Sequence, residues 1–311
     1  MKNNTISING SRKTKRISEM IAQRIFQICA LFAVLGVASI TVYMIINGTP
    51  ALTKVGILEI LFSSDWSPAS AEPVYGILYV ILTSILGTAF AILIGVPIGV
   101  LTAVFLSDVA PKRLVAVVRP AVELLAGIPS VIYGLLGLMI LNPLMYKLEL
   151  VIFRNSKTHQ FTGGANLLSA VLVLAVMILP TVINISETSL RAVPHHLKAA
   201  SLAVGASKIQ TIFKVQIPAA KSGIITAVVL GVGRAIGEAM AISLVAGSAV
   251  NFPLPFNSVR FLTTAIVSEM GYAADTHREV LFTIGLVLFA FIMIINIVLT
   301  KILKKGNEKD D

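Results

Sequence analysis

Charged residues and cysteine are both scarce in this sequence. Its single cysteine, Cys29, excludes an intrachain disulfide bond. Asp, Glu, Lys and Arg together make up only 13% of the 311 residues, whereas hydrophobic residues make up 56% and the mean hydropathy is +0.89. So apolar a composition excludes an ordinary soluble domain and indicates a polytopic membrane protein.

Motifs for catalysis and for binding a cofactor are also missing. The sequence has no G-x-x-x-x-G-K-[S/T] phosphate loop, and the glycines from Gly231 to Gly237 are spaced G-x-G-x-x-x-G, unlike a dinucleotide-binding loop. The adjacent His195 and His196 would lie on different faces of a helix, and no Ser/His/Asp or metal-ligand set stands out. We therefore expect a protein that is not an enzyme, with no catalytic residue, no metal and no cofactor.

Six apolar runs are long enough to cross a membrane as helices, which predicts an all-α fold. They cover residues 25–46, 74–106, 120–141, 167–186, 223–249 and 280–303. We expect a cytoplasmic segment over residues 1–24, disordered or bound to the membrane surface, then a transmembrane domain over 25–305 and a cytoplasmic tail over 306–311. Gly127 and Pro129 should break the helix of the third run, and an external loop should follow over residues 142–166.

Basic residues outnumber acidic ones, 25 to 15, but they lie in short segments between the apolar runs. This pattern indicates membrane topology rather than a nucleic-acid partner. Eighteen of the 25 Lys and Arg residues fall in segments on one side of the six spans, six fall on the other side, and Arg234 lies within a span. The positive-inside rule then predicts a multi-pass protein of the cytoplasmic membrane, embedded in lipid, with both termini in the cytoplasm.

Arg234 and Glu238 lie inside the fifth apolar run. A charge at the bilayer centre costs about 2.5–3.5 kcal/mol on insertion scales, so such residues are candidates for function. Their spacing of four would place both on one face of a helix, beside the small residues Gly233 and Gly237, which would let a neighbouring helix approach closely. Two interpretations stand: an ion pair that fixes helix packing, or an anion path in which the arginine fork binds the oxygens of phosphate or another oxyanion.

The segment over residues 191–221 is too short and too basic to cross the membrane. Its apolar residues Leu202, Ala206, Ile209 and Phe213 recur at helical spacing and predict one amphipathic helix. Such a helix could lie in the lipid interface or dock onto a partner.

This segment also resembles the cytoplasmic EAA loop of ABC importer permeases, which docks onto the ATPase. Gly205 matches the motif glycine, and Ile217 and Pro218 match the end of the motif, whereas Ala199 replaces the motif glutamate. The resemblance implies that a set of residues couples the chain to an ATPase: Ala199, Ala200, Leu202, Gly205, Ala206, Ile209 and Phe213. We call residues 191–221 the coupling segment.

A narrower resemblance covers most of the chain from the second span onward. The stretches over residues 123–134, 177–180, 190–194, 231–240 and 268–271 resemble the PstC-type permease subunit of phosphate-specific ABC importers. This resemblance implies a type I importer permease of MetI-like architecture that moves inorganic phosphate into the cytoplasm by alternating access, with Arg234 and Glu238 in the substrate pathway. It further implies a PstA-like second permease, two copies of an ATPase subunit that hydrolyses ATP, and an external phosphate-binding protein.

Two alternatives remain from the residues themselves. A permease for sulfate, molybdate or phosphonate would keep the coupling segment but not the sequence around Arg234. A secondary anion transporter that needs no ATPase would use the intramembrane charges but would leave the coupling segment unexplained.

The charge asymmetry predicts the topology directly. A reporter fused after Asp311 should be active only in the cytoplasm, and one inserted near Thr162 should be active only outside, because the basic segments are retained on the inner side. Reporter assays at both positions check this, and external activity at Asp311 would overturn the topology.

Overall fold

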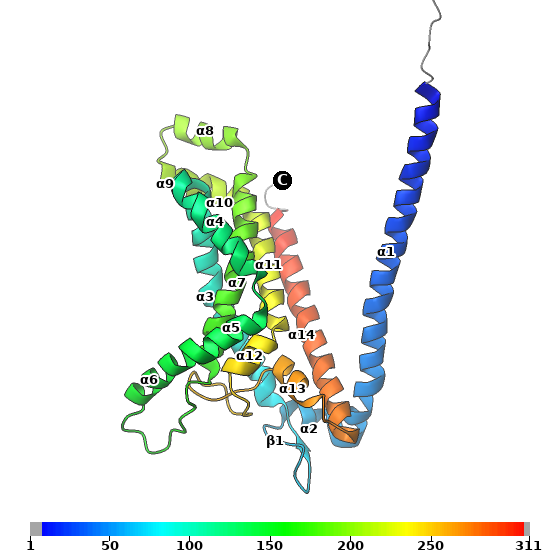
Figure 1. Cartoon of the computed structure of the whole chain (residues 1–311), viewed down its shortest axis with the longest axis vertical. Helices are drawn as coiled ribbons and strands as arrows, with labels where there is room; N and C mark the ends of the chain where they lie inside the picture. The colour runs from blue at the N-terminus through cyan, green and yellow to red at the C-terminus, as the bar shows by residue number, and fades with distance from the viewer. Residues whose placement is uncertain (1–7, 308–311) are drawn as a thin grey trace, which may run out of the picture.

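The chain folds into a bundle of helices, and its computed structural model describes residues 8–307, with side chains over 19–298 and 300–301. Most of the described chain is helical, as the apolar runs predict (Figure 1). The elements are α1 (Ile8–Ala51), a π-helical turn (Leu52–Gly56), α2 (Ile57–Phe62), β1 (Trp66–Ser67), β2 (Val74–Tyr75), α3 (Leu78–Val104), a π-helical turn (Phe105–Val109), α4 (Lys112–Gly127), α5 (Ser130–Leu136), a π-helical turn (Gly137–Leu141), α6 (Asn142–Ile152), α7 (Leu167–Arg191), α8 (His195–Ala203), α9 (Lys208–Thr211), a π-helical turn (Ile212–Gln216), α10 (Ile217–Ala219), α11 (Lys221–Gly237), α12 (Met240–Val245), α13 (Leu262–Glu269) and α14 (Asp275–Asn307).

The two strands form a small antiparallel hairpin in which Trp66 pairs with Tyr75. The hairpin lies at one end of the bundle and α8, α9 and α10 lie at the other (Figure 1). We call these the hairpin end and the coupling end.

Helix α7 is the centre of the bundle and packs against both α3 and α11. Small residues allow the close approach of α3: a Cβ at Gly95 would lie 2.7 Å from Ile178 Cδ1, and one at Gly99 would lie 2.8 Å from Val182 Cγ1. Such contacts matter in lipid, where helices associate through close packing rather than through exclusion of water.

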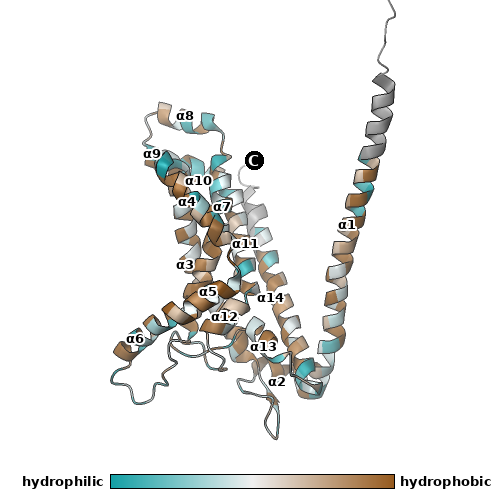
Figure 2. Ribbon diagram, in the orientation of Figure 1, coloured by the Kyte–Doolittle hydropathy of each residue, from teal (hydrophilic) through white to brown (hydrophobic). Residues whose placement is uncertain are grey.

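Five helical segments are long and apolar enough to cross a membrane within the described residues. They are Glu19–Phe62, Leu78–Val109, Ser130–Ile152, Leu167–Arg191 and Asp275–Val298. A sixth is obtained when Lys208–Ala219 and Lys221–Gly237, bent by 70°, count as one span. The expectation of an all-α polytopic membrane protein is therefore confirmed, and the apolar stretches of these helices are visible along the bundle (Figure 2).

Several element boundaries differ from the expectations. Residues 8–24 belong to the long helix α1 instead of being disordered, while residues 1–7 and 308–311 lie outside the described part of the chain. The third run does break at Gly127–Pro129, as predicted, but the helix that follows continues through α6 to Ile152, into the stretch expected to be a loop. The fifth run breaks at Glu238, where a continuous helix was expected.

Helix α1 stands away from the bundle along most of its length and meets α14 near the hairpin end (Figure 1). There Thr283 donates a hydrogen bond to the Gly48 carbonyl (2.8 Å), and Tyr43 packs edge-on against Phe282. Apolar side chains such as Phe26 and Phe32, each 72% exposed, cover α1 from Ile25 to Ile46. This surface suits lipid or another apolar partner in the membrane.

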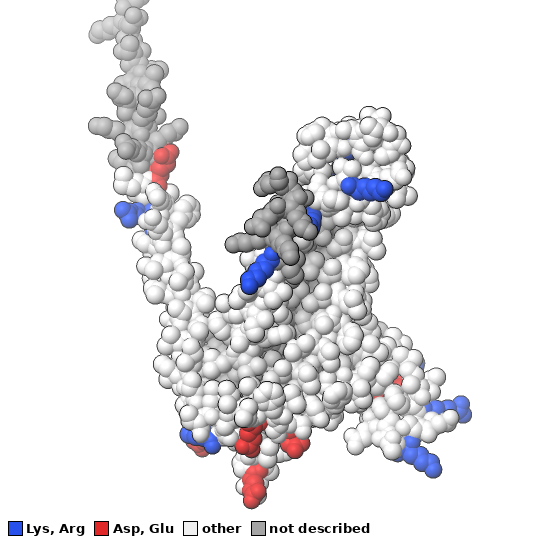
Figure 3. Space-filling view, turned by 180° about the vertical axis from the view of Figure 1, so that it is seen from behind, with Lys and Arg blue, Asp and Glu red and all other residues white. Residues whose placement is uncertain are grey.

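Charge is divided between the two ends. Seen from behind, acidic side chains gather at the hairpin end, whereas basic side chains lie at the coupling end and near the tip of α6 (Figure 3).

Replacement of Gly95 tests the α3–α7 contact. We expect Gly95→Val to destabilise the protein by about 1–3 kcal/mol, because the new side chain would overlap Ile178 and the Ala175 carbonyl oxygen. The midpoint of thermal unfolding in detergent measures this. Gly36→Val is the matched control, since no described atom lies within 4 Å of a Cβ at Gly36; equal midpoints for the two variants would contradict the packing account.

Candidate functional site

The fifth run is broken between α11 and α12, and the break separates Arg234 from Glu238. Helix α11 ends at Gly237, and Glu238 has an extended backbone (φ −75°, ψ 129°). Its carboxylate accepts a hydrogen bond from the Ala241 backbone N–H (2.9 Å) at the start of α12, and its carbonyl accepts one from the Thr263 hydroxyl (2.7 Å). Glu238 therefore caps α12 with its side chain from the position before the N-cap residue, Ala239.

The expectation that Arg234 and Glu238 share one helical face is wrong, because the helix stops between them. The ion pairs among the described residues do not include one between these two side chains. Arg234 is half-buried in the last turn of α11. Its charge is consequently not neutralised by Glu238 in this conformation.

A second break lies beside the first. Between α4 and α5 the Tyr133 hydroxyl donates a hydrogen bond to the Leu125 carbonyl (2.7 Å), which also accepts one from the Ile128 backbone N–H at the end of α4 (3.3 Å). Helix α5 packs on α12, where a Cβ at Gly134 would lie 2.8 Å from the Ala241 Cα. Tyr133 also lies within electrostatic range of Arg234. The two breaks and the arginine therefore belong to one region of the bundle.

One side of α11 is left open by the rest of the chain. Its buried residues, Ala227, Gly231, Val232, Ala235 and Ile236, form the packed side. The exposed side is a stripe of mostly small residues at helical spacing, Ser222, Thr226, Leu230, Gly233 and Gly237. Arg234 follows Gly233 at the margin of this stripe and is half-buried. The stripe is suited to close approach by another transmembrane helix.

Instead of the single amphipathic helix expected, the coupling segment forms α8 and then a second helical stretch made of α9, a π-helical turn and α10. Gly205 lies between them with φ +87°, a left-handed conformation that favours glycine. Ser207 and Gln210 then cap α9 reciprocally. The turn is thus set by local sequence, and it interrupts the helical spacing from Leu202 to Phe213.

The residues expected to couple the chain to an ATPase do come together at the coupling end. Leu202, Ile209 and Phe213 are 50%, 70% and 54% exposed. Ala199, Ala200 and Gly205 are also exposed, and Ala206 is half-buried. Together they form an exposed, largely apolar surface made from α8, the turn at Gly205, α9 and the π-helical turn that contains Phe213.

Asp108 holds this surface to the bundle, and sequence reasoning missed it. Its carboxylate accepts hydrogen bonds from Lys198 in α8 (2.8 Å) and from the buried Gln216 amide, as well as from Ser107. The only sequence signal was an acidic residue in a basic connection. Its partners are far along the chain, so only the fold identifies them.

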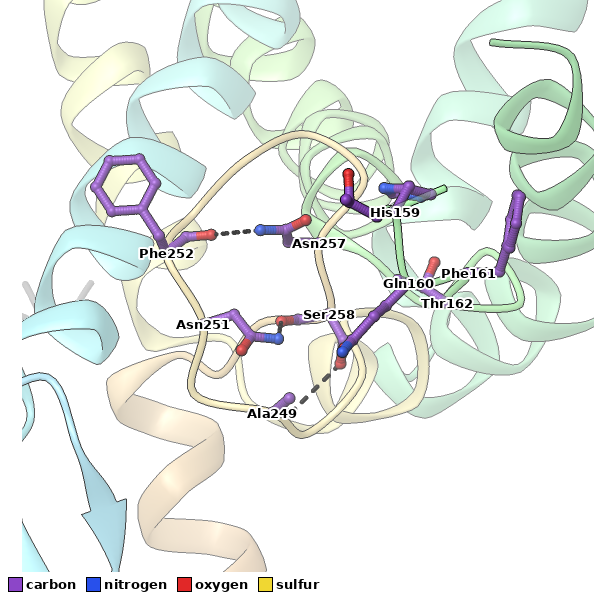
Figure 4. A pocket seen from close by; sticks show the side chains of 10 residues that line it. His159, Gln160, Phe161, Thr162, Ala249, Asn251, Phe252, Asn257 and Ser258 are labelled. Carbon is purple, nitrogen blue, oxygen red and sulfur yellow. Dashed lines mark hydrogen bonds between the residues drawn. The ribbon is translucent and has the colours of Figure 1, made fainter. Parts of the chain in front are cut away.

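At the hairpin end Glu269 joins several elements. It accepts hydrogen bonds from Arg260 and from the Trp66 indole (3.3 Å), and it contacts His277 (2.8 Å). Nearby, a cavity of about 370 Å³ lies between the loop over residues 158–162 and the loop over residues 249–258 (Figure 4). Its lining includes the polar residues Gln160, Asn251 and Asn257. Within residues 8–307, no group of three His, Cys, Asp or Glu residues could hold a metal ion.

The family profile described as "Binding-protein-dependent transport system inner membrane component" matches residues 95–308. The chain belongs to this family. The match contains both helix breaks, Arg234 and the whole coupling segment.

Curated relatives extend the similarity to most of the chain. A probable ABC transporter permease protein, YqgH, of Bacillus subtilis (strain 168) is 37% identical over 294 residues, which cover 92% of each chain. The phosphate transport system permease protein PstC of Xylella fastidiosa (strain 9a5c) is 34% identical over 292 residues, covering 89% of each chain. PstC of Pasteurella multocida (strain Pm70) is 29% identical over 317 residues, covering 96% of this chain and 97% of the relative. These relatives are transporter permeases rather than enzymes.

Among solved structures, a chain of the MetNI methionine ABC transporter in an inward-facing conformation is similar in fold. The TM-score is 0.50 at 22% identity, and the similarity covers 74% of this chain and 94% of that one. The fold of this family member is therefore that of an ABC transporter permease, in agreement with the MetI-like architecture expected from the sequence. It is a multi-pass membrane protein whose EAA-type loop is characteristic of the family.

Proposed function

We propose that this chain is the transmembrane permease subunit of an ATP-driven importer that moves inorganic phosphate from the outside to the cytoplasm. The observation that carries the proposal is Arg234, a half-buried guanidinium beside a helix break, whose carboxylate neighbour Glu238 is engaged in capping α12. A planar guanidinium binds phosphate oxygens through two parallel hydrogen bonds. The names of the PstC relatives support phosphate as the substrate.

The site fits a substrate that must be released again. A single guanidinium gives an anion a binding place without the strong hold of a closed cage, and the Glu238 carboxylate close along the chain lowers the local positive potential. The open stripe on α11 is where a second, PstA-like permease would approach, so that Arg234 would line a path between the two subunits. Alternating access would then expose this path to either side in turn.

Energy has to come from another subunit, because this sequence has no phosphate loop for ATP. The exposed surface of α8 and α9 is the proposed docking site for one of two ATPase copies. Asp108 would transmit movement of this surface to α3 through Lys198 and Gln216. The hairpin end, with its polar loops, would receive the external phosphate-binding protein, and both termini would then be cytoplasmic.

Substitution of Arg234 tests the pathway. We expect Arg234→Gln to abolish phosphate uptake and Arg234→Lys to impair it, because a point charge lacks the two-pronged geometry of guanidinium. Uptake of labelled phosphate is measured at equal membrane abundance, with labelled sulfate in parallel. Arg113→Gln, which removes an exposed guanidinium from α4, outside both the pathway and the coupling segment, is the matched control.

Normal uptake by Arg234→Gln would exclude the anion contact. Arg234-dependent uptake of sulfate in place of phosphate would instead indicate a permease for another oxyanion. If the chain is purified without any ATPase and still takes up phosphate, it would be a secondary transporter.

Substitution of Gly205 tests whether the coupling segment links ATP hydrolysis to phosphate uptake. We expect Gly205→Val to assemble in the membrane but to uncouple ATP hydrolysis from uptake, because valine disfavours the φ of +87° that shapes the turn. Gly205→Asn should retain more coupling, since asparagine adopts left-handed conformations more readily. A Cβ here would meet no described atom within 4 Å, so a clash inside this chain would not explain the loss. Normal phosphate-stimulated ATP hydrolysis and uptake in Gly205→Val would contradict the coupling role.

A further inference from the structure

A second basic site lies at the coupling end, on helices that do not carry Arg234. A cavity of about 630 Å³ is formed where the end of α3, the start of α4 and the end of α7 meet. Its charged lining residues are Lys112, Arg119, Arg191 and Asp108. Three cations therefore face one carboxylate.

Both arginines are hydrogen-bonded to a buried carboxylate that does not line this cavity. Glu187, only 4% exposed, accepts hydrogen bonds from the Arg119 guanidinium and from Arg191 Nε (2.9 Å). Arg191 also donates through Nη2 to the Leu106 carbonyl (3.4 Å). Since each guanidinium has five N–H donors, both arginines keep donors that are free to face the cavity.

The one carboxylate in the lining is already engaged. Asp108 binds Lys198, which does not line the cavity, and also accepts hydrogen bonds from Ser107 and Gln216. Glu187 is shared by the two arginines, and Glu123 lines a neighbouring cavity with both of them, so these two carboxylates offset the two guanidinium charges and Lys112 supplies the excess. A net positive charge thus remains on the cavity wall.

Apart from Ser107, the rest of the wall is apolar and consists of Leu106, Ala110, Val115, Ala116 and Pro120. Basic pockets with apolar surroundings at the end of a transmembrane bundle bind anionic head groups, and guanidinium pairs bind phosphate oxygens in general. Both ligands present the same chemistry, a phosphate group.

We propose that Arg119 and Arg191, assisted by Lys112, bind a phosphate group in this cavity, separately from Arg234. The source is free phosphate or the head group of an anionic phospholipid. If it is free phosphate, the site would hold the substrate on the release side, and this part rests on the proposed function.

Binding is tested on the full-length chain, purified with the subunits that accompany it and carrying Arg234→Gln to remove the pathway contact. Calorimetric titrations use inorganic phosphate in one arm and short-chain phosphatidylglycerol in the other. Arg119→Gln and Arg191→Gln are each expected to raise the dissociation constant about tenfold or more, because one charge-assisted interaction is lost. Either single variant leaves Glu187 with one arginine partner.

Arg113→Gln is the matched control: it removes the same charge from an exposed neighbour that does not line the cavity. Lys112→Gln, at an exposed position, gives a second measurement that does not disturb Glu187, with a smaller rise expected.

The two titrations distinguish free phosphate from a phospholipid head group as the ligand of this cavity. Binding of inorganic phosphate supports a release-side substrate site, and binding of phosphatidylglycerol alone supports a lipid site. Binding of neither probe, or an equal loss of affinity in Arg113→Gln, would overturn the proposal. Phosphate uptake by the chain with Arg234 intact is measured independently, so failure of this site is distinguishable from failure of the proposed function.

Discussion

Breaking a helix inside a membrane bundle leaves backbone groups that bulk water does not reach, and these must be satisfied by protein. At the α11–α12 break Glu238 meets this need twice, through its side chain on the Ala241 N–H and through its carbonyl on Thr263. Thr263 belongs to α13, which packs against α14 at the hairpin end. The break is therefore connected to the hairpin end of the molecule. A movement of α13 would therefore also move Glu238, which lies four residues after Arg234.

The α4–α5 break is stabilised by the same principle with different residues. Tyr133, 7% exposed, reaches back to the Leu125 carbonyl, and the next residue, Gly134, lets α12 approach to backbone contact. Close approach at Gly95 and Gly99 likewise fixes α3 on α7. Because packed small residues permit few intermediate arrangements, the two breaks are expected to shift together rather than one by one.

Buried carboxylates in the bundle lie beside basic side chains. The buried carboxylates Glu149, Glu187 and Glu269 each contact a histidine or an arginine, which offsets the cost of removing them from water. Arg234 differs from this pattern within the described residues, since its nearest carboxylate along the chain caps a helix instead. A half-buried cation in that situation favours an anionic ligand, which is why it carries the proposed function.

A feature could be predicted from the sequence when it depends on neighbouring residues, and could not when it depends on contacts between residues far apart in the chain. Hydropathy and basic segments are local properties, so they predicted the membrane class, the six apolar runs and the break at Pro129, whose ring removes an N–H donor. The positive φ of Gly205 was not predicted, because the apolar spacing from Leu202 to Phe213 indicated one continuous helix although Gly205 matched the motif glycine. Only the tertiary structure decided that Glu238 leaves the helix, because its carbonyl is held by Thr263 from a distant segment. The same holds for Asp108 with Lys198 and for Arg119 with Glu187: these partners lie far apart in the chain, and hydropathy and spacing carry no information about which charges the fold brings together.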